Sequence, residues 1–234
     1  MTGGEISTSF DYGFLVYAST TAAPTISFTN TDFLSNGNGV GSAANSAIRM
    51  DTPATVPSFG SLKMTGGKID KSGYFGLSTG GAFNTDLNNV TVTGSGQSGL
   101  SLAGTGTHVL TGVSATGNAQ SGLAFGGSGS LSSKGLVATG NGAGTNASQI
   151  NITDGATAAT KIEFLANGTT QTTTSRGTSS GTVALVRDGR PSVAGGGTTI
   201  TFAAGSLFQG STLMTSTYTA LTGATPLNVI VPGG

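Results

Sequence analysis

Val90-Thr-Val-Thr-Gly-Ser-Gly-Gln-Ser-Gly-Leu-Ser-Leu102 recurs 23 residues later as Val113-Ser-Ala-Thr-Gly-Asn-Ala-Gln-Ser-Gly-Leu-Ala-Phe125. The first half returns after 23 more residues as Leu136-Val-Ala-Thr-Gly-Asn141. Internal repeats of about 20 to 50 residues are the sequence sign of folds built by stacking one small unit on the next. The spacing therefore predicts a solenoid, in which each repeat packs mainly on its two neighbours.

A looser form of this repeat extends over most of the chain. It consists of an apolar residue, any residue, then Gly, Ser or Ala, then Asn, Ser or Gly, and its copies begin 23 to 32 residues apart. The copies begin at Met1, Phe33, Met64, Val92, Ala115, Ala138 and Phe164. A pair of apolar residues follows each copy, at Phe14/Val16, Ile48/Met50, Phe75/Leu77, Leu100/Leu102, Leu123/Phe125, Ile150/Ile152 and Val183/Leu185. Apolar residues at every second position indicate β-strands.

Each repeat is expected to contain a strand, a tight corner with glycine, a second strand and a variable loop. Strands this short cannot bury a hydrophobic face alone, but stacking each on its equivalent gives a continuous sheet and a continuous core. We therefore predict an all-β fold, a right-handed parallel β-helix of about seven coils, over residues 1–167. Residues 168–182 are expected to form a polar Ser/Thr-rich loop, and residues 183–234 irregular β-coils or a cap.

Four asparagines occupy the last position of the looser repeat: Asn36, Asn118, Asn141 and Asn167. Two explanations remain open. The side-chain amides form an internal ladder at one corner of the coil, or asparagine is present only because it tolerates the turn conformation. The first explanation makes this corner a structural site.

The composition fits a stacked β fold and argues against several classes of protein. The chain has 41 Gly in 234 residues, yet 35% of its residues are hydrophobic and its mean hydropathy is positive, which is too apolar for a disordered chain. Only 8% are charged, with nine basic and nine acidic residues, so a nucleic-acid partner is not expected. Cysteine is absent, and no apolar run is long enough for membrane insertion.

The first residues match an internal repeat. Met1-Thr-Gly-Gly-Glu-Ile6 corresponds to Met64-Thr-Gly-Gly-Lys-Ile69, whereas solenoids usually begin with a cap over the exposed sheet edges. We therefore expect a segment of a larger protein. The alternative is a phage or bacterial protein whose first coil is covered by a partner chain.

The Thr-Gly-Asn corners that end at Asn118 and Asn141, with the Gly-Leu-x-apolar strands that begin at Gly99 and Gly122, resemble the secreted passenger regions of bacterial autotransporters and filamentous adhesins. Phage tailspikes are similar in fold. The resemblance covers about residues 1–167 and implies an extracellular or cell-surface β-helix. It indicates fold much more strongly than function.

Polysaccharide-degrading enzymes also use this fold. Galacturonan hydrolases combine an Asn-Thr-Asp strand with an Asp pair, a Gly-His-Gly turn and an Arg-Ile-Lys strand. Asn30-Thr-Asp32 and Asn84-Thr-Asp86 match the first element, but the other three are absent. A lone carboxylate cannot supply both acid and base for glycoside cleavage. We predict no enzymatic activity, no cofactor and no metal site.

Three further motifs are expected to be structural. His108, the sole histidine, is expected to be solvated or packed against a loop rather than to act as a ligand or base. The segment 177–181 has the spelling of a nucleophile elbow but lies in the Ser/Thr-rich stretch. The segment 94–99 has the spelling of a dinucleotide-binding loop, but no helix is expected after it.

The sequence therefore predicts a non-enzymatic, extracellular structural or adhesive segment of a larger secreted or surface protein. It would be a rigid stalk whose loops at 36–47, 142–149 and 168–182 contact a host-cell receptor or glycan. The alternative is a trimeric phage tail spike or fibre component on the virion surface, with residues 198–234 intertwined. Less favoured is a polysaccharide-degrading enzyme. Self-association through exposed coil ends is expected for the stalk, and a homotrimer for the phage protein.

Overall fold

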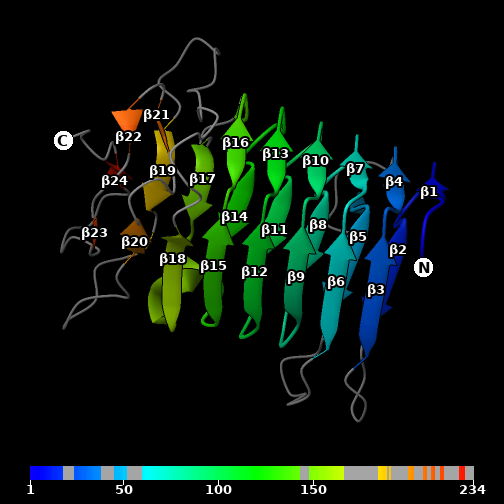
Figure 1. Ribbon diagram of the computed structural model, residues 1–234, viewed down its shortest axis with the longest axis horizontal. Coiled ribbons are helices and arrows are strands. Elements are labelled where there is room, and N and C mark those ends of the chain that lie inside the picture. The colour runs from blue at the N-terminus through cyan, green and yellow to red at the C-terminus, as the bar shows by residue number, and fades with distance from the viewer. Residues whose placement is uncertain are drawn as a thin grey trace.

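The chain forms a β-solenoid of three parallel sheets in a computed structural model of residues 1–234. The structure describes residues 1–17, 24–37, 45–51, 60–142, 148–165, 184–188, 190, 200–202, 208–209, 212–213, 217–218 and 227–229. From β1 to β18 every third strand returns to the same sheet, so the chain winds through each sheet once per coil (Figure 1). This arrangement confirms the predicted parallel β-helix.

We call the three sheets the first, second and third walls, in the order in which the chain enters them. The first wall contains β1 (Glu5–Ser7), β4 (Asp32–Leu34), β7 (Lys68–Asp70), β10 (Thr91–Thr93), β13 (Ser114–Thr116) and β16 (Val137–Thr139). The second wall contains β2 (Phe14–Tyr17), β5 (Ile48–Asp51), β8 (Leu77–Thr79), β11 (Leu100–Leu102), β14 (Leu123–Phe125), β17 (Ser148–Ile152), β19 (Ala184–Asp188) and β24 (Leu227–Val229). The third wall contains β3 (Thr25–Thr29), β6 (Ser61–Thr65), β9 (Asn84–Asn88), β12 (Thr107–Thr111), β15 (Ser130–Lys134), β18 (Lys161–Leu165), β20 (Ile200–Phe202) and β23 (Thr217–Tyr218).

The strands β1 to β18 make six coils, compared with the predicted seven. Beyond them, β19 pairs in parallel with β17 and β20 pairs in parallel with β18, so two walls continue for one more strand. The next strands in these walls, β24 and β23, run antiparallel to β19 and β20. The hairpin of β21 (Phe208–Gln209) and β22 (Thr212–Leu213) and the short 3₁₀ helix η2 (Asp154–Ala158) complete the described elements.

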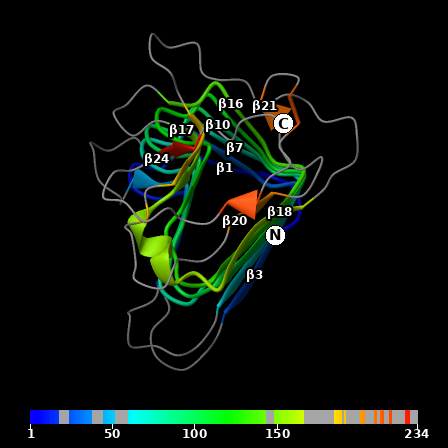
Figure 2. The same ribbon diagram turned by 90° about the vertical axis from the view of Figure 1, so that its left-hand side faces the viewer.

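The core fills the space between the walls, which enclose a roughly triangular section when the solenoid is seen from its end (Figure 2). Side chains at alternate strand positions point inward. Leu77, Leu100, Leu123 and Ile150 of the second wall follow one another in register and are fully buried. Because each coil covers the apolar residues of its neighbour, short strands that would be unstable alone share one continuous core.

Two corners of the triangle use the same backbone conformation. A residue with positive φ follows the first wall in every coil, at Thr8, Ser35, Lys71, Gly94, Gly117 and Gly140. Another follows the third wall, at Asn30, Gly66, Asn89, Gly112 and Gly135, and Gly3 near the start of the chain has the same conformation. Glycine and asparagine adopt this left-handed region at the lowest steric cost, which explains their frequency in the repeat.

This similarity of the two corners made the register of the looser repeat wrong. Phe33 pairs with Ile69 in the first wall, but Met64 pairs with Phe28 and Leu87 in the third wall. Phe164 also lies in the third wall, opposite Ser133. In the second wall Leu77 rather than Phe75 aligns with Ile48, and Val186 aligns with Ile150. The looser repeat therefore combines two different corners of the coil that have the same local sequence pattern.

Candidate functional site

The corner between the first and second walls holds three of the four aligned asparagines. Asn36, Asn118 and Asn141 each follow the positive-φ residue of that corner, and all three side chains are buried. The Nδ2 group of Asn118 donates to Oδ1 of Asn141 at 2.9 Å, which joins two neighbouring coils. Asn141 donates from Nδ2 to Oε1 of Gln149, also at 2.9 Å. Asn118, Asn141 and Gln149 therefore form a short amide ladder inside the solenoid.

The same asparagines also bind backbone groups of the preceding coil. Oδ1 of Asn36 accepts from the backbone N–H of Ser9 at 3.1 Å. Oδ1 of Asn118 accepts from Ser95, and Oδ1 of Asn141 accepts from Asn118, each at 3.0 Å. These N–H groups lie inside the corner, after the strand has ended, where an unpaired donor would be costly. The asparagines therefore stabilise the turn of the coil below as well as their own.

Serine replaces asparagine in the third and fourth coils. The hydroxyl groups of Ser72 and Ser95 are buried and have no hydrogen-bond partner within the part of the chain that the structure describes. A serine side chain is too short to repeat the contacts that Asn36 and Asn118 make. Asn167 lies outside the described residues, and Phe164, which begins its repeat, is in the third wall.

The residue just before the second-wall strand of one coil lies against the corner residue of the following coil. A Cβ atom on Gly99 or Gly122 would lie 2.7 Å from Nδ2 of Asn118 or Asn141. In the same register, Gly76 lies beneath Ser95, and Ala47 lies at the matching position beneath Ser72. Glycine therefore makes room for the asparagine of the following coil. The regular spacing of corner residue and glycine, four residues apart at Ser72/Gly76, Ser95/Gly99 and Asn118/Gly122, is the sequence signal that would have identified this pairing between coils.

His108 lies in the core, which corrects the expectation of a solvated or loop-packed ring. Alternation along β12 turns His108 and Leu110 inward and leaves Val109 outside. The ring is fully buried, with Nδ1 2.8 Å from Oγ1 of Thr85 in the preceding coil. Burial lowers the pKa of His108 to about 4, so the imidazole is neutral at pH 7.

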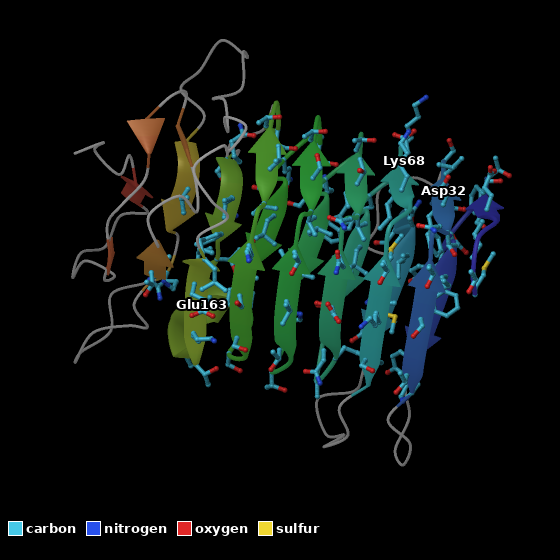
Figure 3. The ribbon with its side chains drawn as sticks, viewed as in Figure 1. Asp32, Lys68 and Glu163 are labelled. Atoms are coloured by element: carbon cyan, nitrogen blue, oxygen red, sulfur yellow. The ribbon has the colours of Figure 1, made fainter. Side chains whose placement is uncertain are left out.

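The two Asn-Thr-Asp sequences lie on different walls. Asp32 is in the first wall, where its Oδ1 accepts from the backbone N–H of Lys68 at 2.8 Å. Asp86 is on the outer side of the third wall and forms an ion pair with Lys63 at 3.3 Å. Figure 3 shows Asp32 close to Lys68 and far from Glu163, which lies at the other end of the solenoid. The two aspartates are therefore not brought together as an acid and base pair.

Charged residues of the first wall are tied into local contacts. Lys68 forms an ion pair with Asp70 at 2.8 Å, and Oγ1 of Thr93 donates to Asp70 at 2.6 Å. Burial alone would raise the pKa of Asp70, but these hydrogen bonds from Lys68 and Thr93 hold the pKa below its ordinary value. Asp70 therefore remains ionised as part of the wall.

The remaining sequence motifs have no catalytic setting within the described chain. Residues 94–99 form the turn between β10 and β11, so a strand rather than a helix follows them. The segment 177–181 and most of the predicted contact loops lie outside the described residues. Among the residues that are described, no three His, Asp or Glu side chains gather in a way that could hold a metal ion. No helix in that part of the chain has the length and apolar character needed to cross a bilayer.

The outer side of the third wall carries a shallow hollow of about 440 Å³, here called the third-wall hollow. It spans β3, β6, β9 and β12. Its outward side chains are Thr25, Ser27, Ser61, Lys63, Asn84, Asp86, Thr107 and Val109. They form two rows that run along the solenoid, because parallel pairing places Ser61 beside Asn84 and Lys63 beside Asp86. This hollow is the candidate ligand-binding feature of the described chain.

Comparison with protein-family models, with curated proteins and with solved structures finds no match to this chain.

Proposed function

We propose that this chain is a non-enzymatic structural and adhesive β-solenoid, a segment of a larger secreted or cell-surface protein that acts as a rigid stalk. The observation that carries the proposal is the continuity of the stack. Parallel pairing runs through six coils of each wall, and one hydrophobic core extends with it. Such a stack resists bending because each coil is hydrogen-bonded to the next along all three walls.

The placement of the acidic residues supports a structural role. Asp32 binds a backbone amide of the neighbouring coil, Asp86 pairs with Lys63, and Glu163 pairs with Lys161 at 2.8 Å. Asp32 and Asp86 connect neighbouring coils, and Glu163 pairs with a residue of its own strand. The extracellular location rests on the resemblance of the coils to secreted passenger regions.

The test is the shape, mass and activity of the purified chain. We expect an elongated particle in small-angle X-ray scattering that resists proteinase K over its coils. Light scattering across a concentration series should give a monomer that associates as the concentration rises. A trimer whose mass does not change with concentration would favour the phage tail alternative. Release of reducing ends from a polysaccharide panel would overturn the non-enzymatic assignment.

A further inference from the structure

We propose that the third-wall hollow binds a neutral, extended oligosaccharide that lies along the solenoid axis across β3, β6, β9 and β12. This inference rests on the proposed adhesive function and names a ligand for it. It was not apparent from the sequence, because the hollow is formed by strands from four coils.

The spacing of the coils matches a linear sugar chain. Neighbouring strands in a sheet lie about 4.8 Å apart, so the four strands of the hollow span about 14 Å. One strand spacing is close to the length of one sugar unit in an extended β-1,4-linked chain. Each coil of the hollow therefore presents two outward side chains at the same two strand positions, one pair beside each successive sugar. An α-1,4-linked chain of the same sugar coils and cannot keep this register.

The polar groups of the hollow suit sugar hydroxyls. Asn84 uses its Oδ1 to accept from the backbone N–H of Thr107 at 2.7 Å, and its Nδ2 has no partner within the described residues. The side chain is thus held in place with a donor directed away from that contact. Oγ of Ser61 lies 3.4 Å from Oγ1 of Thr25 in the preceding coil, so the row that contains Asn84 continues as hydroxyl groups.

The hollow also has apolar surface between these groups. Val109 lies in the same row as Asp86, and the threonines at positions 25 and 107 add methyl groups. Sites for small ligands combine such apolar surface with a few fixed polar groups. A sugar ring has the same mixed character, with C–H faces and hydroxyl edges.

The charge of the hollow favours a neutral ligand. Its two ionised side chains, Lys63 and Asp86, lie 3.3 Å apart and cancel, and their side chains remain 59% and 48% exposed. An anionic sugar would have to displace Asp86 in order to pair with Lys63. A cationic ligand would have to displace Lys63 in order to pair with Asp86. The carboxylate and ammonium groups can instead accept from and donate to neutral hydroxyls without losing each other.

The experiment is a binding titration of the full chain with soluble hexasaccharides. The probes are cellohexaose, β-1,4-mannohexaose and chitohexaose, followed by isothermal calorimetry or by chemical shifts of labelled protein. Maltohexaose is the matched control ligand, because it has the same sugar and length as cellohexaose with an α-1,4 linkage. We expect at least one β-1,4-linked probe to bind with a millimolar dissociation constant and maltohexaose to bind at least tenfold more weakly.

Two matched variants locate the site. Asp86→Ala removes the carboxylate from the hollow and should weaken binding at least tenfold. Glu163→Ala removes a carboxylate from the same outward row of the same wall, three strands further along and outside the hollow, and should leave binding unchanged. Both carboxylates are partly exposed and paired with a lysine, so loss of folding is not expected for either.

The outcomes separate this inference from the proposed function. Failure of all three β-1,4-linked probes to bind, equal binding of maltohexaose, or equal losses in the two variants would each overturn the sugar site. The stalk would then stand on its shape and mass alone. Binding at the hollow with release of reducing ends would support the site but overturn the non-enzymatic function.

Discussion

The histidine and threonine that face each other in the core are the clearest departure from an apolar interior. His108 and Thr85 occupy a column of inward side chains that otherwise continues with Leu62 and Leu131. Their contact of 2.8 Å satisfies Nδ1 of the ring. A protonated imidazole at this position would be buried without a carboxylate partner among the described residues, so protonation of His108 is costly in the folded chain.

Acid should therefore destabilise the fold through His108. The unfolded chain binds the proton with a pKa near 6.5, whereas the folded chain binds it only near a pKa of about 4. Stability that is fully present above pH 6.5 is lost as the pH falls through 4, and the difference amounts to about 3 kcal/mol. Urea unfolding followed by circular dichroism between pH 7.5 and pH 4 measures this loss.

The matched variant for this experiment is Thr85→Val with His108→Leu. It removes both polar groups together, so neither is left buried without its partner. Asp70 and Glu163, whose pKa values are also lowered, remain in the variant and account for the acid sensitivity that persists. Equal pH dependence in the wild type and the double variant would contradict the role of His108.

At the corner between the first and second walls, we expect the same substitution of serine by asparagine to have opposite effects at two positions. Ser95→Asn should stabilise the chain by about 1 kcal/mol, because Gly76 leaves space and the new amide can accept the N–H of Ser72. Ser72→Asn should destabilise it by about 1 to 3 kcal/mol, because the Cβ of Ala47 occupies the space beneath. The free energies of unfolding of the two variants in urea provide the comparison.

The result has an internal control. Combining Ala47→Gly with Ser72→Asn should recover most of the loss, since it recreates the pair seen at Gly99 and Asn118. If Ser95→Asn and Ser72→Asn had the same effect, the glycine beneath the asparagine would not be what controls the fit.

At the level of strands and corners, much of the fold could be predicted from the sequence. The 23-residue repeat predicted parallel stacking, and the pairs at Leu100/Leu102 and Leu123/Phe125 are in register as expected. The inward position of His108 was missed although its alternation with Leu110 carried the signal. The two corners could not be distinguished, because both require an apolar residue followed by a positive-φ position. The third-wall hollow could not be predicted, because strands of four coils line it and the looser repeat had the wrong register for this wall.

The repeat implies that one complete coil can be removed. Deletion of residues 113–135 joins Gly112 to Leu136, which occupies the place of Val113 in the next coil. We expect this variant to fold, with each wall shorter by one strand spacing of about 4.8 Å. Deletion of residues 113–134 is the control. It keeps Gly135 between Gly112 and Leu136, and this one additional residue shifts the register and turns inward side chains outward.

Circular dichroism melting and small-angle scattering measure both deletions. The 23-residue deletion should keep a cooperative transition, and the 22-residue deletion should lose it. Similar melting of the two variants would show that the walls tolerate a shift of register.

Across the whole solenoid, the protection of backbone amides from hydrogen exchange should rise from the first coil toward the middle. Ile6, Phe14, Val16 and Ile26 of the first coil are only partly buried, whereas their counterparts in the central coils are buried. We expect amide hydrogens of β11 and β12 to exchange at least about tenfold more slowly than those of β1 and β2. Hydrogen exchange read by mass spectrometry measures this gradient, and uniform exchange along the chain would indicate that the coils open together.

The reversed strands β24 and β23 affect how copies of this chain could polymerise. A parallel stack acts as a template, because each edge offers the hydrogen-bonding pattern that the next parallel strand needs. On the second and third walls this pattern is already occupied by strands of opposite direction, which present a different pattern outward. A coil arriving at that end finds two of its three walls mismatched. Filament growth, if seeded, would therefore be polar, with elongation disfavoured at this end.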